Sequence, residues 1–301
     1  MLSPGSARRS AVLFVIVASA AFSVAGPFAR LARPIHPLFV AFSRVALAAL
    51  ILAALDLPGI ARAFNALTLR QRVHVFGAGA VLAAHFALFL WGLDLTSVPA
   101  AIALISLQPI SIVLLAWIFF GIRPTRREGL GLFFATAGAL VMSRGAGSGD
   151  HRLLGDLLIL GAVVLYGLYV AVARALRDTI PATPYAALVY ASAAILLALA
   201  LPFTPGAFEN LSPLPVRSAL AVVGLTLFPT LIGHTSVQSA ARILPPSIVA
   251  LVCPFETVGG ILISAALLGA IPAPVEIAAT VIILAGATLV IFGSGDRRQA
   301  G

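Results

Sequence analysis

The chain has 301 residues, of which 61% are hydrophobic and only 10% are charged, and its formal net charge is +9. Soluble domains carry about 25% charged residues, so this composition, with a mean hydropathy of +1.10, indicates a membrane protein and excludes a soluble catalytic domain. All 19 basic residues are arginine, and the absence of lysine excludes a P-loop and a Schiff-base nucleophile.

Ten apolar segments follow one another between breaks that are rich in charge, proline or glycine. Most have roughly 18 to 24 residues, enough to cross a hydrocarbon core about 30 Å thick as a helix. Alternating strands of the barrel type are absent, so the sequence predicts an all-α polytopic membrane protein with ten transmembrane helices. These helices are expected at residues 11–30, 37–56, 73–93, 98–120, 128–144, 154–175, 184–203, 217–238, 246–269 and 273–293.

The arginines lie singly or in pairs between the apolar segments, which is typical of topology signals in a lipid bilayer, so we expect no nucleic-acid partner. If the N-terminus is cytoplasmic, 13 arginines lie on the cytoplasmic side and 6 on the outer side. The positive-inside rule therefore favours a protein with both termini in the cytoplasm. Arg8 and Arg9 precede the first apolar segment, which we expect to remain as an uncleaved helix because nine further segments follow it.

The two halves of the sequence match when the chain is shifted by 148 residues. The matching positions are Gly121 and Gly269, Pro124 and Pro272, Glu128 and Glu276, and Ala137-Gly138-Ala139 and Ala285-Gly286-Ala287. The sequence thus predicts two repeats of five helices, residues 1–147 and 148–301, in one transmembrane domain. Because five is odd, the second repeat enters the membrane from the opposite side, and such inverted repeats are typical of secondary transporters with a binding cavity between the repeats.

The segments LLAWIFFGIRPTRREGLGLFFATAGALV (114–141) and ILISAALLGAIPAPVEIAATVIILAGATLV (261–290) resemble the EamA-type members of the drug/metabolite transporter (DMT) superfamily. Gln108-Pro109 fits the "EP" or "QP" pair of that family in the first half, and Glu256-Thr257 occupies the same place in the second. Within the family the chain is most similar to YddG-like bacterial amino acid exporters. The resemblance implies a multi-pass protein of the bacterial inner membrane that exports aromatic and other neutral amino acids.

Charged groups inside membrane spans are costly, on the order of 2.5 to 3.5 kcal/mol at a helix centre, so they usually face a bundle interior or a wet cavity. Glu256 is the only carboxylate at mid-span; it fits a site for a substrate amine or a proton, or an interhelical hydrogen bond. Its counterpart Gln108 lies at a proline break, which frees backbone groups for a ligand or only produces a kink for packing. Arg44 fits a carboxylate site, a structural pair, or snorkelling to the outer interface.

His85 and His234 lie inside the third and eighth expected helices. They lack the short spacing of metal ligands, so we expect hydrogen-bond donors in a cavity, with no metal and no cofactor. Aromatic side chains are expected as flat apolar walls of this cavity. The full set of expected cavity residues is Phe22, Arg44, His85, Gln108, Ser111, Tyr166, Tyr169, Tyr190, His234 and Glu256.

These expectations combine into a secondary transporter that moves a small metabolite, most specifically an amino acid, by alternating access, and that acts as a monomer without enzymatic activity. An exporter of drugs or other metabolites is the first alternative. A membrane channel stays open as a second, because inverted repeats also occur in channels. A membrane-embedded enzyme is disfavoured, since no clustered acid, base and nucleophile is visible in the sequence.

Overall fold

The computed structural model describes residues 4–121, 123–145, 151–176, 178–243, 249–250 and 252–296, and within these ranges it contains helices and no strands. In chain order the α-helices are α1 (Pro4–Ser23), α2 (Ala25–Leu31), α3 (Pro37–Ala66), α4 (Leu69–Leu95), α5 (Val98–Ile105), α6 (Gln108–Phe120), α7 (Arg126–Ser143), α8 (Leu153–Ala175), α9 (Ala182–Ala200), α10 (Val216–Leu225), α11 (Thr235–Ile243), α13 (Val252–Leu268) and α14 (Pro274–Asp296). Two further elements are the 3-10 helix η1 (Leu201–Phe203) and the π-helix η2 (Thr226–His234). The prediction of an all-helical protein is confirmed for the described residues.

Eight helical stretches of the described chain are long and apolar enough to cross a membrane. They are Val12–Leu31, Pro37–Ala66, Leu69–Leu95, Val98–Leu115, Leu153–Ala173, Ala182–Phe203, Val216–Ala241 and Pro274–Phe292. The other two expected segments, 128–144 and 246–269, correspond to α7, which begins with two arginines and a glutamate, and to α13, which has 17 residues. Part of the segment 246–269 lies outside the described residues.

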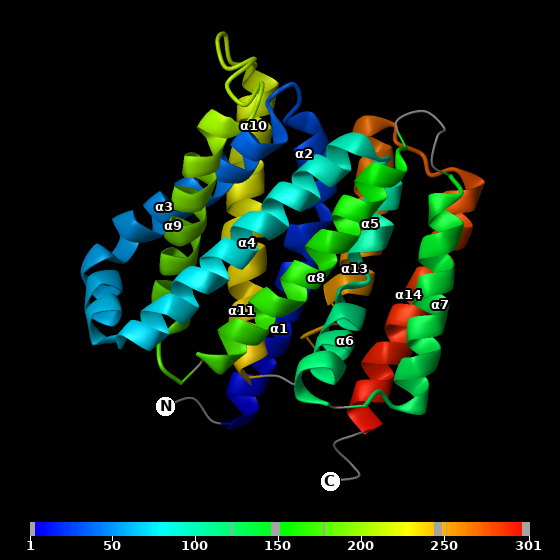
Figure 1. The fold of residues 1–301 in the computed structure, drawn as a ribbon, viewed down its shortest axis with the longest axis horizontal. Helices are drawn as coiled ribbons and strands as arrows, with labels where there is room; N and C mark the ends of the chain where they lie inside the picture. The colour runs from blue at the N-terminus through cyan, green and yellow to red at the C-terminus, as the bar shows by residue number, and fades with distance from the viewer. Residues whose placement is uncertain are drawn as a thin grey trace.

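Helices of the two halves are mixed in one bundle (Figure 1). α7 packs along α14, α3 packs against α9, α4 packs against α8 and α9, and α1 packs against η2, α11 and α13. α1 begins and α14 ends at the lower edge of Figure 1, which we call the terminal end of the bundle; the opposite edge is the far end. α7 ends and α8 begins at the far end, and the connection from α9 to α10 lies there as well.

The matching glycines of the two halves end helices in the same way. Gly121 follows α6 and Gly269 follows α13, and both have a φ of +64°. Residues with a Cβ rarely adopt this left-handed conformation, so glycine is the usual residue at such helix ends. The 148-residue shift therefore pairs positions that share a backbone conformation.

The matching glutamates also have one local role. A carboxylate oxygen of Glu128 accepts a hydrogen bond from the backbone N–H of Thr125 at 2.6 Å, and one of Glu276 accepts from the backbone N–H of Ala273 at 2.8 Å. Each glutamate thus satisfies a backbone donor just ahead of its own helix, α7 or α14, and its negative charge lies at the positive end of that helix.

Several of the expected helices are divided, kinked or irregular; the segment 11–30 is divided at Val24 between α1 and α2. The segment 37–56 continues to Ala66 after a kink at Asp56, whose φ and ψ are −156° and 60° and which is followed by Pro58. The segment 98–120 is divided between α5 and α6, because the helix stops after Ile105 and resumes at Gln108. The segment 217–238 contains the π-helix η2, which the apolar pattern did not indicate. The last two interruptions position groups of the cavity described below.

Candidate functional site

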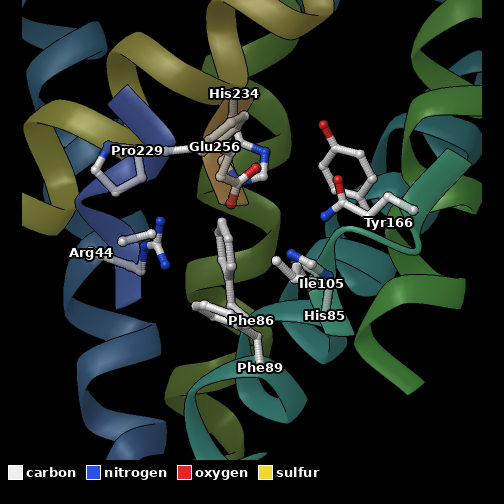
Figure 2. A pocket seen from close by; sticks show the side chains of 12 residues that line it. Arg44, His85, Phe86, Phe89, Ile105, Tyr166, Pro229, His234 and Glu256 are labelled. Atoms are coloured by element: carbon white, nitrogen blue, oxygen red, sulfur yellow. The ribbon is translucent and has the colours of Figure 1, made fainter. Parts of the chain in front are cut away.

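The bundle contains a small central cavity, whose empty space of about 340 Å³ includes space open to solvent. Its lining comes from α1, α2, α3, α4, α5, α6, α8, η2 and α13, so both halves of the chain contribute (Figure 2). The lining residues are Phe22, Ala25, Arg44, His85, Phe86, Phe89, Ile105, Gln108, Tyr166, Pro229, His234 and Glu256.

Most of the cavity residues that were predicted from the sequence lie around this cavity. Seven of the ten line it, namely Phe22, Arg44, His85, Gln108, Tyr166, His234 and Glu256. The other three, Ser111, Tyr169 and Tyr190, are buried behind the lining. Ser111 donates to the Gln108 carbonyl at 2.8 Å, and Tyr169 accepts a hydrogen bond from Gln238. These side chains support the wall and do not form its surface.

Several lining residues were missed in the sequence. Phe86 and Phe89 share α4 with His85, and Phe89 lies one helical turn beyond it, so helical periodicity from His85 indicates it. Ile105 is the last residue of α5, where the helix break turns it to the cavity. Pro229 is the proline inside η2. Proline lacks the N–H that a helix interior requires. Pro229 was therefore the one signal in the sequence that indicated an irregular helix at η2.

Arg44 is the buried cation of the cavity. Its side chain is 1% exposed, its Nε donates to the Thr230 hydroxyl at 2.8 Å, and its guanidinium carbon lies 4.0 Å from the centre of the Phe86 ring. Among the described residues no carboxylate forms an ion pair with it. Snorkelling to the outer interface, one of the three alternatives for Arg44, does not fit this burial, because the side chain is enclosed by α4 and η2. A buried charge without an opposite charge is costly, so the guanidinium is suited to an anionic ligand group.

The π-helix η2 holds the hydroxyl that Arg44 binds. Thr230 donates from Oγ1 to the Leu225 carbonyl at 2.7 Å, and its own carbonyl accepts from the Tyr190 hydroxyl at 3.0 Å. The Thr230 hydroxyl is therefore oriented with its lone pairs free to accept from Arg44. π-helical turns occur frequently at functional sites, and here the turn connects α3, α9 and the cavity through one threonine.

His234 lies at the centre of an aromatic cluster. Its ring meets Phe22 edge-on, with centroids 4.9 Å apart and planes at 82°, and meets Phe86 at 5.0 Å and 88°. The side chain is 3% exposed, and its Nδ1 has no hydrogen-bond partner among the described residues. By contrast, Nδ1 of His85 lies 2.8 Å from the Ala162 carbonyl. His234 thus presents an unsatisfied polar atom beside the cavity, which a ligand can satisfy.

Glu256 belongs to the first two turns of α13 and reaches the cavity (Figure 2). Within the described chain its carboxylate has no hydrogen-bond or ion-pair partner. Around Glu256, α13 runs without interruption from Val252 to Leu268. Pro254 lies in its first turn, where a missing N–H costs nothing. The residues just before α13, 244–248 and 251, lie outside the described residues.

Gln108 and Glu256, the pair related by the shift of 148 residues, come together at the same cavity. Gln108 is the first residue of α6, directly after the break that follows α5. Its Oε1 accepts a hydrogen bond from Sγ of Cys253 at 3.3 Å, and Cys253 lies three residues before Glu256 on α13. This contact joins α6, in the first half of the chain, to α13, in the second half.

A second, apolar pocket adjoins the central cavity. It holds about 680 Å³ of empty space and shares Gln108 and Tyr166 with the cavity. Its remaining lining is almost entirely aliphatic and comes from α6, α8, α11, residues 249 and 250 and α13. The two compartments together offer charged groups next to apolar surface.

Comparison with known proteins agrees with this architecture. Residues 9–144 and 153–292 match the EamA-like transporter family, whereas no curated protein matches the sequence. A crystal structure of a protein that is 20% identical in sequence superposes with a TM-score of 0.68, over 97% of this chain and 99% of the other, and at that identity the likeness concerns the fold alone. Because the two matched segments span most of its length, the chain belongs to the EamA-like transporter family.

Proposed function

We propose that this protein is a secondary transporter that exports amino acids, aromatic and other neutral ones, across the bacterial inner membrane by alternating access through the central cavity. Membership of the EamA-like family supports a membrane transporter of small molecules. The amino acid substrate rests on the cavity chemistry below and on the resemblance to amino acid exporters. The outward direction rests on that resemblance alone.

We further propose that α7 and α13 complete a set of ten transmembrane segments arranged as two inverted repeats of five. The packing supports this arrangement. α3 packs against α9 and α7 against α14, so the second and fifth segments of one half each contact their own counterparts in the other. The contact of α4 with α8 has its equivalent in the contact of α1 with η2 and α11. Equivalent contacts of this kind, made in turn by the matching helices of each half, are expected of a bundle with a two-fold axis in the membrane plane.

The observation that carries the substrate proposal is the pair of opposite charges that line one cavity without pairing with each other. Arg44 is bound to a hydroxyl and a ring face, and the carboxylate of Glu256 has no partner among the described residues. A zwitterion supplies a carboxylate for the first and an ammonium for the second. Each charge of the protein would then gain an opposite charge in a site of low dielectric, where such contacts are strong.

The remaining lining suits the side chain of an amino acid. Phe22, Phe86 and Tyr166 present ring surface to the cavity, and the apolar pocket beyond Gln108 and Tyr166 gives room for a larger apolar group. Aromatic walls favour aromatic and aliphatic side chains over charged ones. This arrangement supports neutral amino acids as the preferred substrates.

The proposed topology follows from the chain ends and the arginines. α1 begins and α14 ends at the terminal end of the bundle (Figure 1), as an even number of spans requires. The excess of arginine supports a cytoplasmic location for this end. The cavity lies within one chain, so a monomer is sufficient for transport.

Counterflow in proteoliposomes tests the proposal. Purified protein is placed in liposomes loaded with an amino acid, a sugar or a cationic drug, and uptake of the labelled compound is followed with and without a pH gradient. We expect trans-stimulated uptake of neutral amino acids. A channel gives no trans-stimulation, an enzyme converts the compound, and counterflow of drugs or sugars alone would refute the amino acid substrate.

Glu256→Gln tests the role of the carboxylate, and Glu209→Gln is its matched control, because Glu209 lies on the exposed connection after η1. We expect Glu256→Gln to weaken amino acid uptake about tenfold or more through loss of a charge-assisted contact. Glu209→Gln should transport like the unaltered protein. Equal uptake by both variants would remove Glu256 from the binding site, and proton dependence that survives Glu256→Gln would exclude it as a coupling group.

A further inference from the structure

A group of five polar side chains joins helix ends at the far end of the bundle. We call it the polar latch, and its members are Thr96, Ser97, His151, Asp156 and Glu276. Thr96 and Ser97 connect α4 to α5, His151 lies just before α8, and Asp156 and Glu276 lie in the first turns of α8 and α14. The latch therefore connects the first half of the chain to the second.

The latch is continuous from α4 to α14. The Thr96 hydroxyl donates to Oδ1 of Asp156 at 2.7 Å, and Nε2 of His151 lies 2.8 Å from the other oxygen of that carboxylate. Nδ1 of His151 is 3.7 Å from Oε1 of Glu276, which accepts a hydrogen bond from the Ser97 hydroxyl. The imidazole thus lies between the two carboxylates, and each carboxylate has a hydroxyl donor as well.

The latch is shielded from solvent. Thr96, His151, Asp156 and Glu276 are each at most 5% exposed. Buried polar groups are tolerated only with partners, and separating such a network would leave two carboxylates and an imidazole unsatisfied. Arg30 at the end of α2 adds to this closure, because its Nη2 donates to the backbone carbonyls of Leu93 at 2.9 Å and of Thr96 at 2.5 Å.

On the side of the central cavity away from the polar latch, further pockets extend toward the terminal end of the bundle. The apolar pocket shares Gln108 and Tyr166 with the central cavity, and it shares Ala171 with a third pocket of about 1,470 Å³. That third pocket is lined in part by the exposed residues Arg70 and His74 near the start of α4. The start of α4 lies toward the terminal end (Figure 1). A succession of pockets thus extends from the central cavity toward the terminal end.

We propose that the polar latch closes the central cavity at the far end and that its contacts break whenever the cavity opens to that side. The inference rests on the proposed alternating-access transport and specifies how one of its two gates is held shut. In a secondary transporter the two halves rock against each other around the binding site. A network that joins α4 and α5 to α8 and α14 has to separate when the far end opens.

Cys253 provides a reporter, because it is the single cysteine of the chain and lines the apolar pocket beside Gln108. Membrane vesicles of both orientations are treated with a membrane-impermeant maleimide, and a C-terminal protease-sensitive tag identifies the face that carries the terminal end. We expect the unaltered protein to be labelled faster from the terminal face than from the far face. Cys253→Ala gives the background.

Thr96→Val and Asp156→Asn each remove a contact of the latch with little change in shape. We expect each to raise the rate of labelling from the far face about tenfold, which corresponds to a shift of about 1.4 kcal/mol in the equilibrium between the two states. Thr136→Val is the matched control, since the Thr136 hydroxyl is exposed on α7 and donates only to the Leu132 carbonyl. It should label like the unaltered protein.

Ser97→Ala is a milder variant that decides the question if Asp156→Asn does not fold, as judged by gel filtration in detergent. Unchanged far-face labelling of folded Thr96→Val and Ser97→Ala would overturn the latch. The combination of Thr96→Val with Asp156→Asn should be less than additive, because both substitutions weaken the same connected contacts of Asp156 with Thr96 and His151. Labelling is measured without substrate, so a failure of the amino acid counterflow would refute the proposed substrate and leave the result on the latch intact.

Discussion

The contact between α7 and α14 depends on glycine at positions where no side-chain atom fits. A Cβ on Gly138 would lie 2.6 Å from Cγ1 of Ile283, 2.9 Å from its backbone nitrogen and 3.1 Å from the Ala279 carbonyl oxygen. Carbon atoms pack best at about 3.5 to 4.0 Å, and two of the three opposing atoms belong to the backbone of α14. The helices would have to separate, so we expect Gly138→Ala to lower the free energy of unfolding by about 1 to 3 kcal/mol.

Gly129→Ala is the control on the same helix, because a Cβ on Gly129 would have no atom within 4 Å. Alanine has a higher helix propensity than glycine by about 1 kcal/mol, so this variant should be as stable as the unaltered protein or more stable. Both variants and the unaltered protein are compared by chemical unfolding in detergent, followed by circular dichroism. If Gly138→Ala is as stable as Gly129→Ala, the close approach of α7 and α14 is wrong.

Thr230→Val removes the hydroxyl that accepts from Arg44, so we expect the half-saturating substrate concentration in counterflow to rise about tenfold or more; an unchanged value would contradict the positioning role. Arg44→Lys keeps the charge but loses the planar group that stacks on Phe86, and it should impair transport by a similar factor. At the start of α3, burial lowers the pKa of His36, whose Nδ1 accepts from the Leu38 N–H. The unfolded chain therefore binds a proton more readily, and stability should fall as the pH drops below about 6.5; His36→Asn, which can also cap the helix, should weaken this pH dependence of the unfolding temperature.

The sequence could predict the elements that depend on local pattern. Apolar runs located most of the helices to within a few residues, because lipid imposes their length and polarity; α3 is an exception, since it continues past the expected end to Ala66. The matched residues Gly121 and Gly269, and Glu128 and Glu276, were visible as repeats, and the structure adds their physical roles in helix termination and capping. Buried polar groups in the spans were also a sound guide, since most of those selected line the central cavity.

Contacts between distant parts of the chain could not be predicted in the same way. Arg44 and Thr230 are 186 residues apart, and nothing in either segment specifies which residue of the π-helix will face α3. The polar latch could not be predicted either, because its members come from three distant parts of the sequence. Thr96, His151 and Asp156 looked like ordinary polar residues at the ends of spans, and only the packing of α4 against α8 brings them into one buried network.

In the proposed inverted arrangement, residues that differ between the halves set the balance between the two open states. If the two halves were identical, the states open to either side would be related by symmetry and equal in free energy, apart from the membrane environment. Only a contact that lacks an equivalent at the other end can favour one state. His151 and Asp156 lie in the junction between the halves and in the first turn of α8, and the residue 148 positions before Asp156 is Arg8. The Asp156 carboxylate therefore has no acidic counterpart in that register, whereas Glu276 matches Glu128. The Asp156 part of the latch is thus suited to set the balance between the two open states. Weakening it should move the resting protein toward the far-open state before any substrate binds.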